Sequence, residues 1–323
     1  MSSPAISRRT FLHQSGSCAA HLSLAAVLLP PALRARWPGR VVGRIVAEEP
    51  FGRLEQLAEG VWGLVSTPLG GDFTTVSNGG LIAGKQGVLA IEGFQKPEGA
   101  TWLAGKAREL TGRFPTHVLL THYHSDHANG VAGYLEGGAR PVVHSSDVTR
   151  ALVLERNKPA DDPRSRALAE AVPIDPAGPA TLDLGGTVVR IVPRSGHTAS
   201  DVSVELDDPS LVFSGDLVWN GMFPNFMDAA PLTLGTSVRA LRRSGNVVYL
   251  PGHGPVATPA DFDRYVAMLD DVERAARSAH ERGQTAAEAA AAYKIPASLG
   301  EWTLFSPRFP EGAFTAWYRD LNK

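Results

Sequence analysis

The chain has 323 residues, of which 43% are hydrophobic and 20% are charged, and its formal net charge is −2. This length allows a large core in one domain or two. The near-neutral charge gives no reason to expect a nucleic-acid or anionic-membrane partner, and no apolar run after residue 40 is long enough to span a bilayer.

The N-terminus resembles an export signal. Residues Ser7–Leu12 read Ser-Arg-Arg-Thr-Phe-Leu, similar to the twin-arginine motif, and the weakly apolar stretch Ala19–Leu29 has the length of a signal-peptide h-region. We therefore predict a signal or disordered segment over residues 1–40 and a periplasmic or extracytoplasmic protein. The alternative is a basic, disordered tail. The sequence does not define a cleavage site. If the segment is not removed, it would act as a signal anchor, and this anchor would be the only membrane contact.

Cysteine usage limits the chemistry of the chain. Cys18 is the only cysteine and lies within the presumed signal. The mature chain then has neither a disulfide nor a thiolate, so any metal site must be built from His, Asp and Glu.

The first half of the chain predicts short strands, a helix and a buried strand. Amphipathic spacing predicts a helix over Pro97–Gly112, and a second helix is expected over Asn129–Glu136. The predicted strands, separated by Gly- and Asn-containing turns, are Gly60–Val65, Gly80–Ala83, Gly87–Ile91, Thr116–Leu120 and Pro141–His144.

A polar stretch, Asn157–Arg166, is predicted to be an exposed connection to a second series of strands. A helix is expected over Ala260–Ala292, in two pieces broken at Gly283. The two halves of strands and helices are broadly similar, so we predict one domain, residues 41–323, with pseudo-symmetric halves. The second-half strands are Gly186–Val192, Val202–Leu206, Leu211–Phe213 and Asn246–Leu250.

A cluster of metal-binding side chains follows the strand that ends at Leu120. His122, His124, Asp126 and His127 form the pattern His-x-His-x-Asp-His. On extended backbone, side chains two apart point the same way, so His122 and His124 are placed to bind one ion. If the chain then turns, Asp126 and His127 face a second. Imidazole and carboxylate are ligands that zinc accepts.

Three further candidate ligands follow later predicted strands. His197 comes after the strand ending at Val192, Asp216 after the strand at Leu211, and His253 after the strand near Val247. A glycine one or two positions before each ligand allows a sharp turn and close backbone approach to an ion. Loops at strand ends are where rigid scaffolds present their chemistry.

This ordered set resembles that of the metallo-β-lactamase superfamily, over nearly the whole chain from about Leu54. The resemblance implies an α/β fold, an αββα four-layer sandwich of two mixed sheets with the metals at one edge. It implies one metal on His122, His124 and His197. It implies a second metal on Asp126, His127 and His253, with Asp216 bridging the two.

The predicted cofactor is a pair of Zn²⁺ ions. Two divalent ions with Asp126, Asp216 and a bridging hydroxide leave about one net positive charge, which favours an anionic substrate or a developing oxyanion. Metal binding lowers the pKa of water from about 15.7 to near 7, so hydroxide is available at neutral pH. We assign catalytic roles to Asp216, as the bridge, and to Asp126, which is placed to accept a hydrogen bond from the nucleophile.

Glu92 departs from the family pattern, which has Asp at the end of this early strand. The resemblance implies that this residue supports the ligand histidines, and the longer Glu side chain can still reach them, so retuning is expected rather than loss. His144 is expected to be structural or to support a ligand. His117 and His280 are interpreted as ordinary strand and helix residues.

The predicted function is hydrolysis of an ester, thioester, lactone or amide/β-lactam bond in a small-molecule substrate. A complete pair of metal sites that share Asp216 resembles the metal sites of thioesterases and lactonases more than those of dedicated β-lactamases. The alternative is a persulfide-dioxygenase-like oxidoreductase with one Fe²⁺ on His122, His197 and Asp216. A binding protein without catalysis is disfavoured because no ligand is missing. The oligomeric state is not indicated by the sequence.

Aromatic residues near the ligands suggest a pocket wall. The segment Trp219–Asp228 follows Asp216 and mixes aromatics with methionine. It is interpreted as the apolar wall of a substrate pocket or, equally, as a loop packed on the core. Trp302, Phe305 and Phe309 are expected in the core or at the rim.

Overall fold

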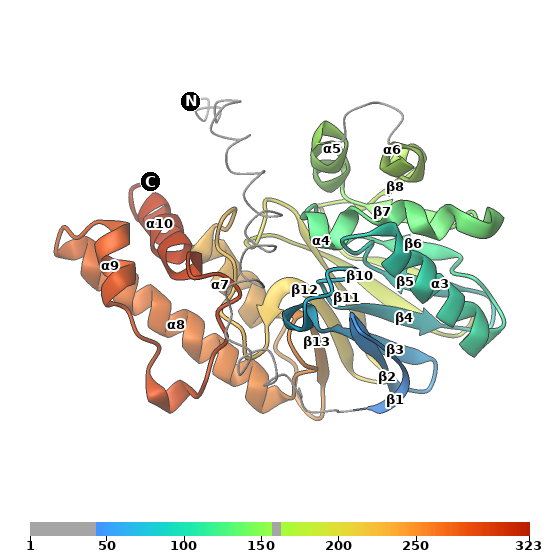
Figure 1. The fold of residues 1–323 in the computed structure, drawn as a ribbon, viewed down its shortest axis with the longest axis horizontal. Helices are drawn as coiled ribbons and strands as arrows, with labels where there is room; N and C mark the ends of the chain where they lie inside the picture. The colour runs from blue at the N-terminus through green and yellow to red at the C-terminus, as the bar shows by residue number, and fades with distance from the viewer. Residues whose placement is uncertain (1–42, 157–162) are drawn as a thin grey trace.

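The computed structural model describes residues 43–156 and 163–323 of the chain. Two β-sheets lie face to face, and helices cover the outer face of each (Figure 1). The predicted αββα arrangement is confirmed. Within the described residues, none of the helices combines the length and the apolar character needed to cross a membrane.

The first sheet has eight strands in the order β1 to β8. Pairing is antiparallel from β1 to β5 and parallel from β5 to β8. The sheet is therefore mixed, and its parallel part leads into the histidine cluster. Its strands are β1 (Arg44–Glu49), β2 (Gly52–Ala58), β3 (Val61–Ser66), β4 (Gly79–Ala83), β5 (Val88–Ile91), β6 (His117–Leu119), β7 (Val142–Ser145) and β8 (Val172–Pro173).

The second sheet has five strands in the order β13-β12-β11-β10-β9. It too is mixed, because β9 to β12 pair antiparallel while β12 and β13 pair parallel. Its strands are β9 (Ala180–Asp183), β10 (Val188–Arg194), β11 (Asp201–Leu206), β12 (Leu211–Trp219) and β13 (Val248–His253).

The helices lie outside the sheets. Helix α3 packs on the first sheet, α7 and α8 pack on the second, and α10 packs on α7, α8 and α9. The helices are α3 (Pro97–Thr111), α4 (Ser125–Ala128), α5 (Asp147–Arg156), α6 (Pro163–Leu168), α7 (Pro231–Ala240), α8 (Pro259–Glu281), α9 (Ala286–Ala292) and α10 (Phe309–Leu321), with 3-10 helices η1 (Pro68–Gly70), η2 (Val131–Gly138) and η3 (Ala297–Leu299).

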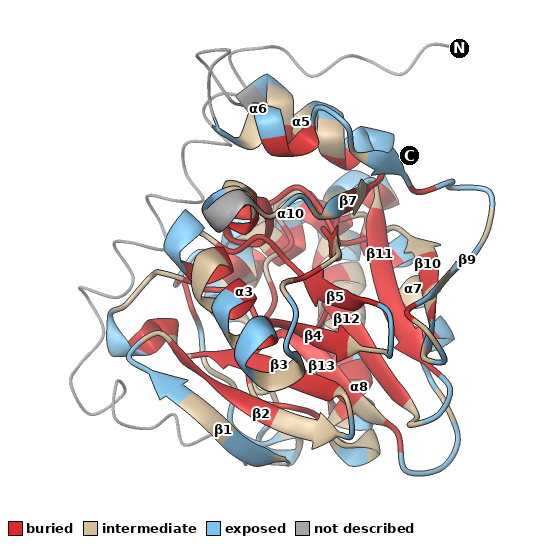
Figure 2. Cartoon of the chain, turned by 90° about the vertical axis from the view of Figure 1, so that its right-hand side faces the viewer, coloured by how far each residue is buried: buried red, intermediate tan, exposed pale blue. Residues whose placement is uncertain are grey.

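Alternating side chains on the strands divide the core into three layers. Figure 2 shows that the central strands of both sheets are buried. In β4, Leu81 faces α3 and the next residue, Ile82, faces the second sheet. Phe213 in β12 packs in that same central layer, whereas Val212 packs toward the helices of the second sheet. Because successive strand residues point to opposite faces, each central strand is buried on both sides.

Several predicted elements differ in extent or type. Asp216 lies within β12 rather than after a strand, because the parallel pairing with β13 continues past a register shift at Gly215. The helix predicted over Asn129–Glu136 is the 3-10 helix η2. A β-carbon on its Gly133 would lie 2.1 Å from the Pro97 carbonyl oxygen, so close packing on α3 requires glycine there.

Other boundaries also differ from those predicted. Part of the predicted connection, residues 163–166, is in α6, and residues 157–162 lie outside the described part of the chain, as do the export motif and Cys18. Strands β1, β2, β8 and β9 were not predicted. The break of the long C-terminal helix at Gly283 is confirmed, since α8 ends at Glu281 and α9 begins at Ala286.

Candidate metal centre

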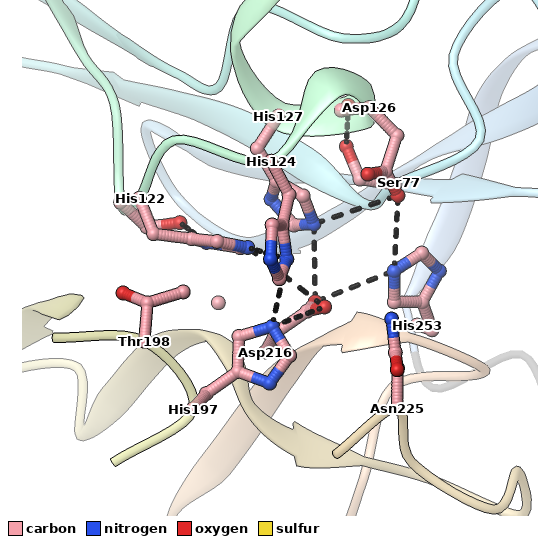
Figure 3. Close-up of polar contacts among 12 residues, drawn as sticks. Ser77, His122, His124, Asp126, His127, His197, Thr198, Asp216, Asn225 and His253 are labelled. Atoms are coloured by element: carbon pink, nitrogen blue, oxygen red, sulfur yellow. Dashed lines mark hydrogen bonds and ion pairs between the residues drawn. The ribbon is translucent and has the colours of Figure 1, made fainter. Parts of the chain in front are cut away.

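Seven buried imidazole and carboxylate side chains meet at one edge of the two sheets (Figure 3). They form two groups, and within each group the candidate ligand atoms all lie within 4.8 Å of one another. The first group is His122, His124, His197 and Asp216, and the second is Asp126, His127 and His253. Every residue predicted as a ligand is thus at this edge.

Different elements supply the two groups. His122 and His124 lie between β6 and α4, Asp126 and His127 lie in the short helix α4, and His197 follows β10. Asp216 and His253 lie in the neighbouring parallel strands β12 and β13. Gly252 is required beside Asp216, because a β-carbon there would lie 1.9 Å from the Asp216 carboxylate.

The first group has the spacing expected of ligands to one small ion. His124 Nδ1 lies 3.1 Å from His122 Nε2 and 3.0 Å from His197 Nε2. Asp216 Oδ2 lies 3.2 Å from His197 Nε2 and 3.9 Å from His122 Nε2. Ligands at about 2.0–2.1 Å in a tetrahedral site are roughly 3.3 Å apart, so these four atoms fit a zinc-sized ion.

Asp216 connects the two groups through its two oxygens. While Oδ2 faces the first group, Oδ1 lies 3.1 Å from His127 Nε2 and 3.3 Å from His253 Nε2. Asp126 Oδ2 lies 3.2 Å from His253 Nε2. A carboxylate with one oxygen toward each group has the geometry of a bridging ligand.

Unsatisfied buried atoms test whether this site fits metal ions. His127 Nε2 and Asp216 Oδ1 are buried and make no hydrogen bond, although they lie 3.1 Å apart. Buried polar atoms without a partner are costly and call for an explanation. A second cation bound by Asp126, His127 and His253 would satisfy both atoms, and the oxygen and nitrogen donors suit zinc.

Glu92 supports the second group, as the resemblance implied. Its Oε1 lies 2.9 Å from His127 Nδ1 and accepts a 2.5 Å hydrogen bond from the Thr121 hydroxyl. The Thr121 hydroxyl also lies 3.0 Å from His122 Nδ1. Glu92 has φ +78, in a region that favours glycine, and such strain persists where surrounding contacts hold it.

Asp228 was missed as a supporting residue by the sequence interpretation. Its Oδ2 lies 2.9 Å from His124 Nε2 and accepts a 2.6 Å hydrogen bond from the Tyr123 hydroxyl. Because His124 turns its Nδ1 toward the first group, the Asp228 contact fixes the orientation of the ring. Asp228 ends the aromatic segment predicted as a pocket wall, but nothing in that pattern indicated a histidine partner.

We expect Asp228→Asn to weaken metal binding to the first group by about tenfold, because the carboxylate that orients His124 is lost. Binding to the second group should change little. Cobalt titration followed by visible spectroscopy would separate the two steps, and Tyr123→Phe, which keeps the Asp228 contact, is the control. Equal affinity of the wild type and Asp228→Asn for the first cobalt ion would contradict this role.

Two further contacts hold the ligand imidazoles. Asp201 accepts hydrogen bonds from the backbone nitrogens of His197 and Thr198, each at 3.0 Å, and so fixes the loop that carries His197. The Trp219 ring packs against His253, with centroids 4.0 Å apart and the ring planes tilted by 34°. The site is therefore preorganised by the residues around it.

Charges within the site shift the pKa values of its ligands in opposite directions. Burial lowers the pKa of His253, but the Asp216 and Asp126 carboxylates outweigh it and raise the pKa to about 9. Burial likewise opposes the protonation of His127, yet Asp216, Glu92 and Asp126 raise its pKa well above 6.5. Burial and the neighbouring imidazoles lower the pKa of His122 well below 6.5.

We therefore expect zinc binding to the metal-free protein at pH 7 to release protons, since ligand imidazoles must be neutral. The apparent affinity of the second group should fall about tenfold per pH unit for each proton released as the pH drops from 9 to 7. Calorimetry in buffers with different ionisation enthalpies would count the protons. Heats that do not depend on the buffer would contradict this.

A cavity of about 490 Å³ opens onto the metal-binding groups. His124, Asp126, Asp216 and His253, all of them buried, are among the residues that line it. This volume is typical of a site for a small molecule. The residues that complete its lining are Trp219, Asn225, Met227, Phe305, Ser306, Arg308, Phe309, Glu311, Gly312, Thr315, Ala316 and Arg319.

Both interpretations of the segment Trp219–Asp228 hold in part. Trp219 and Met227 line the cavity, whereas Phe223 and Phe226 are buried in the core beneath it. The C-terminal aromatics also divide: Phe305 and Phe309 line the cavity, and Trp302 packs beside Tyr265.

The remaining histidines among residues 43–156 and 163–323 lie outside both groups. His144 Nε2 lies 3.1 Å from His117 Nδ1 and contacts no ligand in the structure. Burial, and then the His117 imidazole, lower the pKa of His144 to about 4. His280 lies in α8 beside Asn322. Of the two roles expected for His144, the pairing with His117 fits the structural one.

Comparison with known proteins agrees with this geometry. The family model of the metallo-beta-lactamase superfamily matches residues 74–253. A hydroxyacylglutathione hydrolase of Rhodopseudomonas palustris (strain BisA53) is 27% identical over 66% of this chain and 74% of that one. The thioesterase pkgB of Emericella nidulans is 28% identical over 47% of this chain, but the match spans only 39% of that protein's length.

A solved structure supports the fold at lower identity. The sec-alkylsulfatase Pisa1 from Pseudomonas sp. aligns with a TM-score of 0.65 and 14% identity, over 93% of this chain and 61% of that one. At this identity the likeness concerns the fold alone.

Proposed function

Because the chain belongs to the metallo-β-lactamase superfamily and is a hydrolase of that superfamily, we propose that it is a dinuclear zinc enzyme that hydrolyses acyl bonds, with thioesters as its preferred substrates. The observation that carries the proposal is the position of Asp216, which turns one oxygen toward each group of ligands. The relatives described as a thioesterase and a hydroxyacylglutathione hydrolase support the choice of bond.

In this proposal His122, His124 and His197 hold one zinc ion, Asp126, His127 and His253 hold the other, and Asp216 binds both. Bound there, the metal pair would supply a hydroxide nucleophile near neutral pH and an electrophile for the scissile carbonyl. Esters, lactones and β-lactams are the other substrates that this chemistry admits.

The residues of the chain orient the reactants. Asp126 lines the cavity, where its carboxylate is placed to accept a hydrogen bond from the attacking water. Its own pKa is lowered: burial would raise it, but the His127 and His253 imidazoles outweigh that effect. Trp219 packs against His253 and so helps to hold this imidazole in place beside the cavity.

A substrate panel tests the proposal. Protein loaded with zinc would be assayed on matched thioester, ester, lactone, β-lactam and phosphoester substrates, with a chelator control. The proposal expects thioester hydrolysis with the highest kcat/KM, loss of activity with chelator, and recovery with zinc. Thioester hydrolysis that persists in the metal-free protein, or activity restricted to phosphoesters, would overturn it.

We also propose export, on the residues of Ser7–Leu12 alone. The twin-arginine pair should be needed for transport, so replacing Arg8 and Arg9 with lysine should retain a full-length fusion to a reporter in the cytoplasm. Export of the doubly substituted fusion at the wild-type level would overturn this part of the proposal.

A further inference from the structure

We propose that the cavity beside the metal-binding groups is built for an acyl substrate with a compact apolar body and a carboxylate, and that Arg308 binds this carboxylate while one face of α10 forms the wall against the apolar body. This inference rests on the proposed function and names the class of substrate for the same site.

Helix α10 presents one face to the cavity. Arg308 precedes its first turn, and Gly312, Ala316 and Arg319 follow at intervals of four, four and three residues. Residues so spaced lie on the same side of a helix. The two central positions carry the smallest side chains, so the helix leaves room in the cavity where larger residues would fill it.

Apolar side chains face this wall. Trp219 and Met227 line the same cavity, and the Trp219 ring meets the ring of Phe309, the first residue of α10, edge to face with centroids 6.0 Å apart. A β-carbon at Gly312 would have no heavy atom within 4 Å. The space between the helix and the aromatic rings therefore suits a flat or branched apolar group of limited size.

The charges at and just before α10 favour an anion on that side of the cavity. Arg308 and Arg319 contribute two positive charges and Glu311 one negative charge, whereas the lining carboxylates of Asp126 and Asp216 belong to the groups of candidate metal ligands. Arg319 donates a hydrogen bond to the Ala229 carbonyl oxygen, which ties α10 to the loop before α7. Arg308 is exposed, and its backbone is held by a 3.3 Å hydrogen bond to the Ser306 hydroxyl. Because a guanidinium binds a carboxylate through paired hydrogen bonds, Arg308 is the residue assigned to it.

The test compares two thioesters that differ only in charge, 3-(benzoylthio)propanoate and 3-(benzoylthio)propanamide. Hydrolysis of either adds water across the C–S bond and releases benzoate and a thiol, which a chromogenic disulfide detects. The wild type should prefer the acid by about tenfold or more in kcat/KM, mainly through a lower KM. In Arg308→Gln the two substrates should become nearly equal in kcat/KM, mainly because the KM for the acid rises.

Two variants control for general effects of charge. Arg308→Lys should keep part of the preference, because the charge remains while the paired hydrogen bonds are lost. Arg282→Gln removes an exposed arginine whose side chain donates hydrogen bonds to Ser278 and Gln284. Arg282 is not among the residues that line the cavity, so this variant should keep the full preference. A preference for the acid that survives in Arg308→Gln, or its absence from the wild type, would overturn the inference.

A second pair of variants tests the wall. Gly312→Leu should lower the ratio of kcat/KM for benzoyl over acetyl thioesters by about tenfold, because the new side chain occupies the apolar space. Gly105→Leu is the matched control, since Gly105 is also a helical glycine with open space around it, on α3 and away from the cavity. Equal ratios in Gly312→Leu and the wild type would contradict the assigned wall.

Failure of the inference and failure of the proposed function give different results. Equal hydrolysis of the acid and the amide leaves the hydrolase in place and removes the carboxylate site. If zinc is bound but neither thioester is cut, the proposed function fails. Calorimetric binding of the thioether 3-(benzylthio)propanoate, which cannot be hydrolysed, then decides the inference: about tenfold weaker binding by Arg308→Gln supports it, and equal binding overturns it.

Discussion

Replacement of Asp216 by alanine is expected to lower kcat/KM for a thioester by about 1,000-fold or more, which corresponds to roughly 4 kcal/mol of transition-state stabilisation. The same variant should bind fewer than two zinc ions per chain at concentrations that saturate the wild type. Both effects have one cause, because Asp216 turns one carboxylate oxygen toward each group of ligands.

The physical reason is the position of a buried carboxylate among imidazoles. Its Oδ1 lies 3.1 Å from His127 Nε2 and its Oδ2 lies 3.2 Å from His197 Nε2. Burial would raise the pKa of Asp216, but His253, His127 and His197 hold it well below its usual value. The carboxylate is therefore ionised in the metal-free site, and removing it leaves cationic groups without their counter-charge.

Two further variants separate charge from shape. Asp216→Asn keeps the size of the side chain but removes its charge, so it should lose nearly as much activity as alanine. Asp147→Ala removes an exposed carboxylate in α5 and should leave both activity and metal content unchanged. Full activity of Asp216→Ala with two bound zinc ions would contradict the bridging role.

Replacement of Glu92 by alanine should weaken zinc binding to the second group by about 10- to 100-fold and lower the free energy of unfolding of the metal-free protein by about 1–3 kcal/mol. Glu92 is 1% exposed. Its loss leaves His127 Nδ1 and the Thr121 hydroxyl without their buried acceptor. Glu92→Asp, the residue typical of the family, should retain more affinity than alanine does.

Glu55 provides the matched control, because it is a fully buried glutamate on β2, ion-paired with Arg53 at 2.6 Å and outside both ligand groups. Glu55→Ala should lower stability without changing zinc affinity. Competition with a chromophoric chelator measures affinity, and denaturant unfolding measures stability. If Glu92→Ala and Glu55→Ala had the same zinc affinity, Glu92 would not orient His127.

The ligand types and the fold could be predicted because their signals are local. The pattern from His122 to His127 follows a buried strand directly, and the short apolar strands bounded by glycine indicated a sheet-rich α/β fold. The resemblance then supplied the remaining order of ligands. That order lies outside what any one segment can reveal, since the first and last ligands are more than a hundred residues apart.

What was missed depends on contacts between distant segments. Which nitrogen of His124 faces the first group is decided by Asp228, which lies on another loop. The glycine at position 215 indicated a turn, yet it forms an irregularity inside β12 because the parallel neighbour β13 continues the pairing. The cavity wall likewise needs α10 to pack against α7 and α8, and packing of this kind leaves no periodic signal near the ligands.

Metal analysis of the freshly purified full-length protein, combined with a thioesterase assay on the same sample, tests the central claim most directly. Two zinc ions per chain are predicted, with activity that disappears as a chelator removes them and returns in proportion to the zinc restored. The contradicting result would be one iron per chain, oxygen consumption when a persulfide is added as substrate, and no thioester hydrolysis. It would show that the site belongs to a mononuclear iron oxidoreductase and not to a dinuclear hydrolase.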